Sequence, residues 1–207
     1  ELASVPGVSA VGFTTHLPLS WGDQAAPVRR PGDPVYHDWL AMGGFRVVTP
    51  EYFGVLRQPV LRGRAFTASD RAGSALVAII TPGIAERLWP GQDPIGKTVA
   101  TNYMVNTWMT VVGVVREASS WTMPRGSQNE IFVPAAQQPN AEPLRMQLVA
   151  AVRTQGDPAA LMPVVRDRLR TLVPESPATL STLEQRIASS AADRRFAMLA
   201  LSAFGVI

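Results

Sequence analysis

The sequence contains no cysteine, which excludes disulfide bonds, thiolate chemistry and cysteine-based metal sites. Histidine is nearly absent as well. His16 and His37 stand alone, and neither has a spacing to the other or to a carboxylate that suits a metal ligand. No GxSxG motif of a serine hydrolase occurs, and two isolated histidines make a catalytic triad hard to build.

Lysine is also scarce, since Lys97 is the only one and arginine supplies the other basic residues. The 19 basic and 16 acidic side chains leave a net charge of only +3, and the arginines are scattered along the chain. A nucleic-acid binder would concentrate its positive charge on one face and interleave aromatic residues with it. We therefore expect no nucleic-acid partner. With 46% hydrophobic and 17% charged residues, the chain is expected to fold.

An apolar run of twelve residues without a charge lies at the end of the sequence, from Phe196 to Ile207. A membrane-spanning helix needs about 20 apolar residues. Because the sequence stops before any polar residue ends this run, we expect the first part of a truncated transmembrane helix. A buried C-terminal helix of a soluble domain is the alternative.

Several segments have the composition of β-strands. A short alternating stretch begins at Val8, and near-continuous apolar runs are typical of strands buried on both faces. The expected strands are Val8–Phe13, Phe45–Thr49, Ala75–Thr81, Thr107–Val115, Glu130–Pro134 and Leu144–Arg153, the last with a helical alternative. Residues 20–42 are predicted to be a loop, and Arg62–Phe66 a turn.

Helices are predicted where a capping residue precedes a proline. Thr49 caps Pro50–Arg57, and Thr81 caps Pro82–Trp89. Asp157 precedes a helix with apolar residues at three- and four-residue steps, which Pro163 should kink or delay and Pro174 should end. Ser181 and Glu184 form a capping-box pattern before a helix that continues unbroken through Arg194–Arg195 into the apolar tail.

One string matches a nucleotide-binding motif. Gly91–Thr98 fits GxxxxGK[ST], in which backbone N–H groups surround phosphates, a lysine reaches them and a hydroxyl binds Mg²⁺. That chemistry needs a strand before the loop and a helix after it, whereas here a helical segment precedes and a β-rich segment follows. Pro94 also lacks one of the N–H groups needed for phosphate. We favour a structural turn, and predict no catalytic, cofactor-binding or metal-binding residue and no enzymatic activity.

The order of these segments resembles the MacB-like periplasmic core domain of ABC transporter permeases, the FtsX-like or type VII ABC family. The Val48–Phe53 segment is similar to the family pattern V-S-P-x-Y-F, and Leu61–Asp70 to L-x-G-R-x-F…D. Residues Val77–Ile80 and Ala85–Lys97 resemble V-A-V-I…A-x-R-x-F-P…D-P-I-G-K. The resemblance covers nearly the whole chain and explains the nucleotide-motif lookalike as the family's D-P-x-G-K turn.

The resemblance implies an α+β fold. A porter-like α/β subdomain would be formed by residues 1–70 and 141–190, with a β-rich Sabre-like subdomain inserted at 71–140 and a transmembrane helix starting at 191–207. The implied function is that of the extracytoplasmic domain of a bacterial inner-membrane permease, which couples cytoplasmic ATP hydrolysis to export or to periplasmic mechanotransmission. An extracytoplasmic ligand-sensing module and a P-loop nucleotide-binding enzyme are the alternatives.

The resemblance also implies partners on both sides of the membrane. In the cytoplasm the partner is an ABC ATPase subunit or domain, and a second permease makes a homo- or heterodimer. In the periplasm an adaptor protein is expected, and lipid should surround the C-terminal helix.

Overall fold

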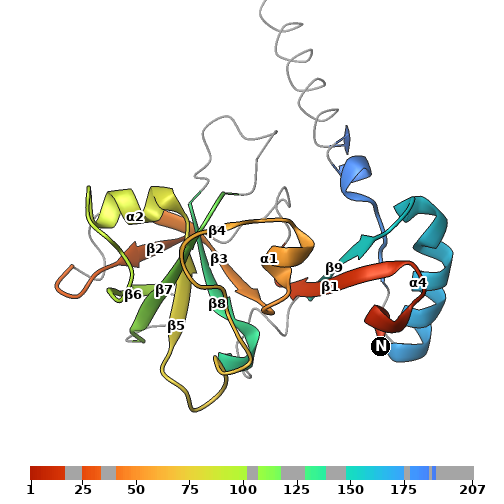
Figure 1. Cartoon of the computed structure of the whole chain (residues 1–207), viewed down its shortest axis with the longest axis horizontal. Coiled ribbons are helices and arrows are strands. Elements are labelled where there is room, and N and C mark those ends of the chain that lie inside the picture. Colours follow the sequence, from red (N-terminus) through yellow and green to blue (C-terminus); the bar gives the residue numbers. More distant parts are fainter. Residues whose placement is uncertain are drawn as a thin grey trace, which may run out of the picture.

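The computed structural model describes residues 1–16, 25–33, 41–101, 107–117, 129–138, 148–174, 178–186 and 188–189. It mixes helices with strands (Figure 1). The strands are β1 (Val8–Thr14), β2 (Ala25–Arg29), β3 (Met42–Val48), β4 (Val60–Gly63), β5 (Val77–Ile80), β6 (Thr98–Thr101), β7 (Met109–Val115), β8 (Glu130–Pro134) and β9 (Val149–Thr154). The helices are α1 (Tyr52–Val55), α2 (Pro82–Leu88) and α4 (Pro158–Leu172), with short 3-10 turns η1 (Leu2–Ser4) and η3 (Ala135–Gln137).

Six of the strands close into a ring. Hydrogen-bonded neighbours follow the order β2, β6, β7, β5, β8 and β3, and β3 pairs again with β2. The pairs β3–β8 and β5–β7 are parallel, and the other pairs of the ring are antiparallel. Strand β2 completes the barrel because its first residues pair with β3 and its last two with β6. Closure removes the exposed edges that an open sheet would present.

The central strands are buried on both faces. In β5, Ala78 and Ile80 join one apolar cluster, with Ile84 and Leu88 of α2. The alternate residues Val77 and Ile79 join a second cluster with Tyr52 and Phe53 of α1, Phe66 and Phe132. Because neighbouring side chains of a strand point to opposite faces, two apolar layers require a continuous apolar sequence. This requirement explains the runs from which these strands were predicted.

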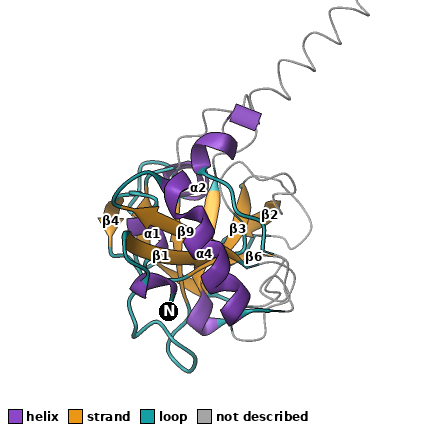
Figure 2. Ribbon diagram, turned by 90° about the vertical axis from the view of Figure 1, so that its right-hand side faces the viewer, coloured by secondary structure: helices purple, strands orange, loops and turns teal. Residues whose placement is uncertain are grey.

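The two ends of the described chain form a second layer beside the barrel. β1 pairs antiparallel with β9 over most of its length and meets β3 at the Thr14–Val48 pair. Helix α4 packs against β9 and η1, and Figure 2 shows it lying across β1 and β9. Gly12 of β1 allows α1 to approach, since a Cβ atom there would lie 2.8 Å from the Cα of Tyr52. The pairing of β1 with β9 therefore places residues from both ends of the described chain side by side.

A buried ion pair joins two strands of the barrel. Arg46 of β3 donates through Nε to Glu130 of β8, and its side chain is 3% exposed. The same arginine donates through Nη1 to the carbonyl of His16. Two hydrogen bonds join Glu130 to Thr81. The N–H of Glu130 donates to Oγ1 of Thr81, and the N–H of Thr81 donates to the carbonyl of Glu130. Buried charges are tolerated where partners of this kind satisfy them.

The predicted strands at 75–81, 107–115 and 130–134 are confirmed as β5, β7 and β8, and those near Val8 and Phe45 as β1 and β3. Val149–Thr154 is a strand, so the helical alternative there is wrong. Two predictions of irregular structure are also wrong. The predicted loop 20–42 contains β2, and the predicted turn at Arg62 belongs to β4, which pairs with β7.

The predicted helices are found with altered ends. α1 covers only Tyr52–Val55 with Glu51 at its N-cap, because Oγ1 of Thr49 accepts from the N–H of Phe13 instead. Thr81 does precede α2, although its hydroxyl serves Glu130 rather than the helix. Asp157 caps α4 as predicted by accepting from the N–H of Ala159. α4 ends at Leu172, before Pro174, and Pro163 lies inside it, so Pro163 does not delay its start.

The predicted capping box is displaced by one residue. The side chains of Thr182 and Gln185 each accept from the other's backbone N–H, whereas Ser181 and Glu184 were expected to do so. A short helical segment at 183–186 follows. Within the described ranges, no helix is long and apolar enough to cross a membrane. The predicted transmembrane start at 191–207, with Arg194–Arg195, lies outside those ranges.

Helix α1 ends in a left-handed turn at an arginine. The N–H of Gln58 donates to the carbonyl of Phe53, and that of Arg57 to the carbonyl of Gly54, which is the bonding pattern of a Schellman motif. Arg57 has φ = 53°, and among the described residues it is the only non-glycine residue with positive φ. A side chain in this conformation is strained, and glycine usually occupies the position.

Replacing this arginine with glycine should stabilise the fold. We expect Arg57→Gly to raise the free energy of unfolding by about 0.5–1 kcal/mol, because relief of the left-handed strain exceeds the added freedom of the unfolded chain. Urea denaturation measures the change. Arg62→Gly is the matched control, since Arg62 lies in strand β4 without positive φ and its loss should lower stability. Equal effects of the two variants would contradict this explanation.

A second prediction concerns the contact of β7 with the segment after β4. A Cβ atom on Gly113 would lie 2.3 Å from the carbonyl oxygen of Arg64, which is closer than non-bonded atoms approach. We expect Gly113→Ala to lower the free energy of unfolding by about 1–3 kcal/mol through overpacking. Gly156→Ala is the control, because nothing lies within 4 Å of its Cβ position. A Gly113→Ala variant as stable as this control would contradict the prediction, because it would show that the barrel shifts at this point to make room for the added methyl group.

Candidate functional site

The string that matches a nucleotide-binding motif forms a turn between a helix and a strand. Helix α2 ends at Leu88, the chain turns at Gly91 (φ = 66°) and Gly96 (φ = 81°), and β6 begins at Thr98. This order is the reverse of the strand, loop and helix that hold a nucleotide phosphate. The structure therefore supports the prediction of a structural turn.

The three backbone N–H groups that follow Pro94 in this turn are already used. The N–H of Gly96 donates to the carbonyl of Val111, and the N–H of Lys97 donates to the carbonyl of Pro94. Ile95 donates to Oδ1 of Asp93, and Pro94 has no N–H. A phosphate cradle depends on free, convergent N–H groups. The turn thus lacks the feature that would make a triphosphate site.

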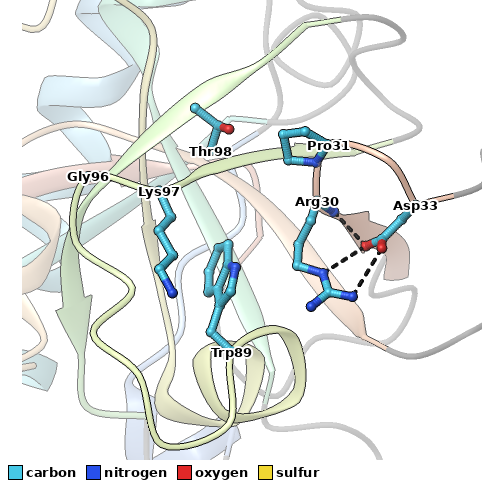
Figure 3. A pocket seen from close by; sticks show the side chains of 7 residues that line it. All are labelled: Arg30, Pro31, Asp33, Trp89, Gly96, Lys97 and Thr98. Atoms are coloured by element: carbon cyan, nitrogen blue, oxygen red, sulfur yellow. Dashed lines mark hydrogen bonds and ion pairs between the residues drawn. The ribbon is translucent and has the colours of Figure 1, made fainter.

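A pocket of about 390 Å³ lies beside this turn. Its wall is made by the end of α2, the start of β6 and the turn after β2, which are far apart in the sequence. Figure 3 shows the seven lining residues, Arg30, Pro31, Asp33, Trp89, Gly96, Lys97 and Thr98. Sequence reasoning singled out Lys97 and Thr98 but missed Arg30, Asp33 and Trp89, since no local pattern links them.

An ion pair makes one side of the pocket rigid. Nε and Nη2 of Arg30 donate to the two carboxylate oxygens of Asp33, and Nη1 donates to the carbonyl of Leu88 at 2.7 Å. The N–H of Arg30 also donates to Asp33. The hydrogen bond from the Arg30 side chain holds the pKa of Asp33 below its ordinary value, against the opposing effect of burial. Asp33 is therefore a carboxylate at neutral pH.

Lys97 forms the opposite side of the pocket together with Trp89. The ammonium group stands 5.2 Å from the centre of the Trp89 ring, a cation–π contact, and donates to Oε1 of Gln92. Trp89 is buried, whereas Lys97 and Thr98 are half-buried. The lysine thus contacts two neutral partners.

The other segments that carry the family resemblance have structural roles. Tyr52 and Phe53 are buried and pack their rings against Phe132. Arg64 donates through both terminal nitrogens to Asp70, which also accepts from the N–H and hydroxyl of Thr67. The hydrogen bonds from Arg64 and Thr67 lower the pKa of Asp70. This network fixes the segment between β4 and β5.

The two histidines do not form a metal site with other described residues. No group of three or more His, Asp or Glu side chains in the described part of the chain is placed to hold a metal ion. His16 lies after β1, where its carbonyl accepts from Arg46 and from Oγ1 of Thr14. His37 lies outside the described residues.

The sequence matches the model of one family. The family model described as the MacB-like periplasmic core domain matches residues 3–172, which begin within η1 and end with the last residue of α4. The chain belongs to this family. It is therefore a MacB-like periplasmic core domain of an ABC transporter permease, and members of this family are permease components rather than classical enzymes.

Curated relatives share a limited stretch of sequence with this MacB-like domain. The macrolide export ATP-binding/permease protein MacB of Marinobacter nauticus is 36% identical over 83 residues, 40% of this chain and 12% of that protein. The pyoverdine export ATP-binding/permease protein PvdT of Pseudomonas putida is 33% identical over 94 residues, 45% of this chain and 14% of that protein. The chain thus spans about an eighth of the length of these relatives.

Solved structures show the same fold at low sequence identity. The periplasmic region of MacB from Actinobacillus actinomycetemcomitans matches with a TM-score of 0.58 at 16% identity, over 83% of this chain and 70% of that one. The extracellular domain of the ABC-type transporter YknZ from Gram-positive bacteria matches with a TM-score of 0.53 at 21% identity, over 84% and 79%. These matches support the mixed helix and strand fold.

The Arg64–Asp70 network gives a pH-dependent prediction. We expect Asp70→Asn to lower the free energy of unfolding by about 1–3 kcal/mol at pH 7, because the amide cannot accept all the bonds that the buried carboxylate accepts. The folded-state pKa of Asp70 is lowered, so its stabilisation is fully present above the unfolded pKa of about 3.9 and is lost as pH falls through the folded-state pKa. The difference between wild type and variant should therefore shrink below about pH 4.

Urea denaturation at pH 7, 5 and 3 measures this difference. Asp167→Asn is the matched control, since Asp167 and its partner Arg170 are both 74% exposed and such pairs contribute little. A difference that persists unchanged at pH 3 would show that the charge of Asp70 is not what stabilises the segment.

Proposed function

We propose that this MacB-like domain couples ATP hydrolysis in the cytoplasm to substrate export or mechanotransmission on the periplasmic side. The observation that carries this proposal is the β1–β9 pairing within a domain of this family, because it joins the two ends of the described chain into one body. Motion arriving through either end would then reach the barrel through hydrogen-bonded strands. The curated relatives named as export ATP-binding/permease proteins support a function in export.

The path out of the domain supports a mechanical role. Helix α4 packs against β9, and the chain continues to a helical segment that starts with the Thr182–Gln185 capping box. We propose that this segment continues into a transmembrane helix at 191–207, as the apolar tail predicts. Such a helix would act as a lever between the membrane and β9.

We also propose a division into two subdomains. β1, β9, η1 and α4 would be the porter-like unit, built from both ends of the chain, and the closed barrel the Sabre-like unit. Because β2 and β3 are barrel strands, the inserted unit would begin before β2 rather than at residue 71. The second boundary would remain near residue 141.

The partners proposed for this domain follow from its place in a permease. They are a cytoplasmic ABC ATPase subunit or domain, a second permease in a homo- or heterodimer, a periplasmic adaptor and the lipid around the C-terminal helix. The permease would lie in the bacterial inner membrane with this domain on its periplasmic side.

The coupling role can be tested in the full-length permease with its ATPase, reconstituted in nanodiscs. Because this domain has no native cysteine, Glu86→Cys on the exposed face of α2 introduces one spin label per copy in the domain. We expect ATP with vanadate to change the distance between labels of two copies, measured by pulsed electron spin resonance. Inserting Gly-Ser-Gly between Val173 and Pro174 should abolish the change while ATP hydrolysis continues, because a flexible joint replaces the connection between α4 and the lever.

The control is the same insertion after Gly73, in an exposed turn between β4 and β5. It should leave the ATP-dependent distance change in place. Absence of any ATP-dependent change without an insertion, or equal loss from both insertions, would contradict the coupling role.

A further inference from the structure

The pocket beside Gly91–Thr98 contains hydrogen-bond donors that the fold does not use. Neither Oγ1 of Thr98 nor the indole N–H of Trp89 forms a hydrogen bond to another described residue, and both residues line the pocket. Figure 3 shows Arg30 and Pro31 on the other side of the space. Both donors face the open space of the pocket, where they are available to an acceptor-rich ligand.

Lys97 supplies a positive charge without a matching carboxylate. Within the described ranges, no ion pair joins Lys97 to an acidic side chain, whereas Arg30, Arg46 and Arg64 each have one. Among the described residues, its ammonium group contacts the neutral partners Trp89 and Gln92, which leave its charge unmatched. A fixed and uncompensated cation on a pocket wall attracts an anion.

The charges of the lining residues favour a ligand with a single negative charge. Lys97 and Arg30 are cationic and Asp33 is ionised, so the lining carries one net positive charge. Arg29 is not among the lining residues; its guanidinium lies 4.9 Å from the Trp108 ring, and its charge contributes to the lowered pKa of Asp33. A phosphate dianion would face the Asp33 carboxylate without the backbone N–H groups that usually bind it, since those of Gly96, Lys97 and Ile95 are occupied.

We propose that this pocket binds a carboxylate group. Lys97 attracts the carboxylate, and Oγ1 of Thr98 and the indole N–H of Trp89 donate hydrogen bonds to it. Carboxylates accept such charge-assisted bonds well, and their single charge matches that of the lining. The carboxylate belongs either to a small organic acid or to an acidic segment of a protein. This site is independent of the proposed coupling role.

Binding can be measured on the whole chain through the indole NMR signal of Trp89. The signals of the five tryptophans are assigned with single Trp→Phe variants. Titration with N-acetylglycine should shift the Trp89 signal, with a Kd of about 1 mM for so small a ligand. Its neutral amide, N-acetylglycinamide, should have no effect. Lys97→Met and Thr98→Val should each weaken binding at least about threefold, and Lys97→Arg should retain most of it.

Arg166→Met is the matched control, because it removes one positive charge from the exposed side of α4, which does not line the pocket. It should leave the affinity unchanged, and thermal unfolding confirms that each variant is folded. A peptide rich in glutamate that binds more tightly than N-acetylglycine, with the same dependence on Lys97, identifies an acidic protein segment as the source. Equal affinities identify a small organic acid.

Three results would overturn the proposal. The first is a Trp89 shift that the amide reproduces, and the second is a shift that survives unchanged in both Lys97→Met and Thr98→Val. The third is tighter binding of inorganic phosphate than of N-acetylglycine, which would assign the pocket to a different class of anion. None of these results depends on ATP, membrane or a second permease, so failure here is separate from failure of the coupling role.

Discussion

The pairing of β1 with β9 is the contact on which the rest of the architecture depends. It brings Thr14 next to Val149, so the entire barrel lies in a loop that this pair closes. Closing a longer loop costs only slightly more entropy, which allows a barrel-sized insertion. The cost appears in kinetics instead, because contacts between residues far apart in the sequence slow folding.

The barrel itself depends on a short strand with few distinguishing features. β2 bridges β3 and β6 through only five residues, and without it the ring would open between those two strands. Opening would expose the edges of β3 and β6 together with the apolar cluster that contains Val28. The buried Arg46–Glu130 pair lies on the next pair of strands, β3 and β8. Polar and apolar contacts thus fix the same part of the ring.

The sequence predicted an element correctly where a pattern of neighbouring residues is itself the physical cause of that element. β5 and β8 were predictable because burial on both faces demands continuous apolar residues, and the start of α4 because Asp157 caps it through adjacent atoms. β2 and β4 were missed because neither gives a local strand signal: Pro27 interrupts β2, and β4 has only four residues, of which the last two are arginine and glycine. Pairing with distant strands decides their conformation. The capping box was misplaced because Ser181–Glu184 and Thr182–Gln185 both match the pattern. The pocket was not predicted, although Lys97 and Thr98 drew attention as part of the Gly91–Thr98 string, since only the tertiary fold brings Arg30 to Lys97.

The antiparallel direction of β1 and β9 has a mechanical consequence. Val8, where β1 begins, pairs with Thr154, where β9 ends, so the chain enters and leaves this ribbon at the same end. A force that pulls the start of β1 away from the end of β9 would break the pairs between the two strands one after another, beginning with Val8 and Thr154. Two paired strands resist a force in this direction least. A displacement that moves the start of β1 and the end of β9 together places no force on the hydrogen bonds between the two strands. The pairing of β1 with β9 therefore withstands a movement that the two chain ends of this pair share far better than a movement that separates them.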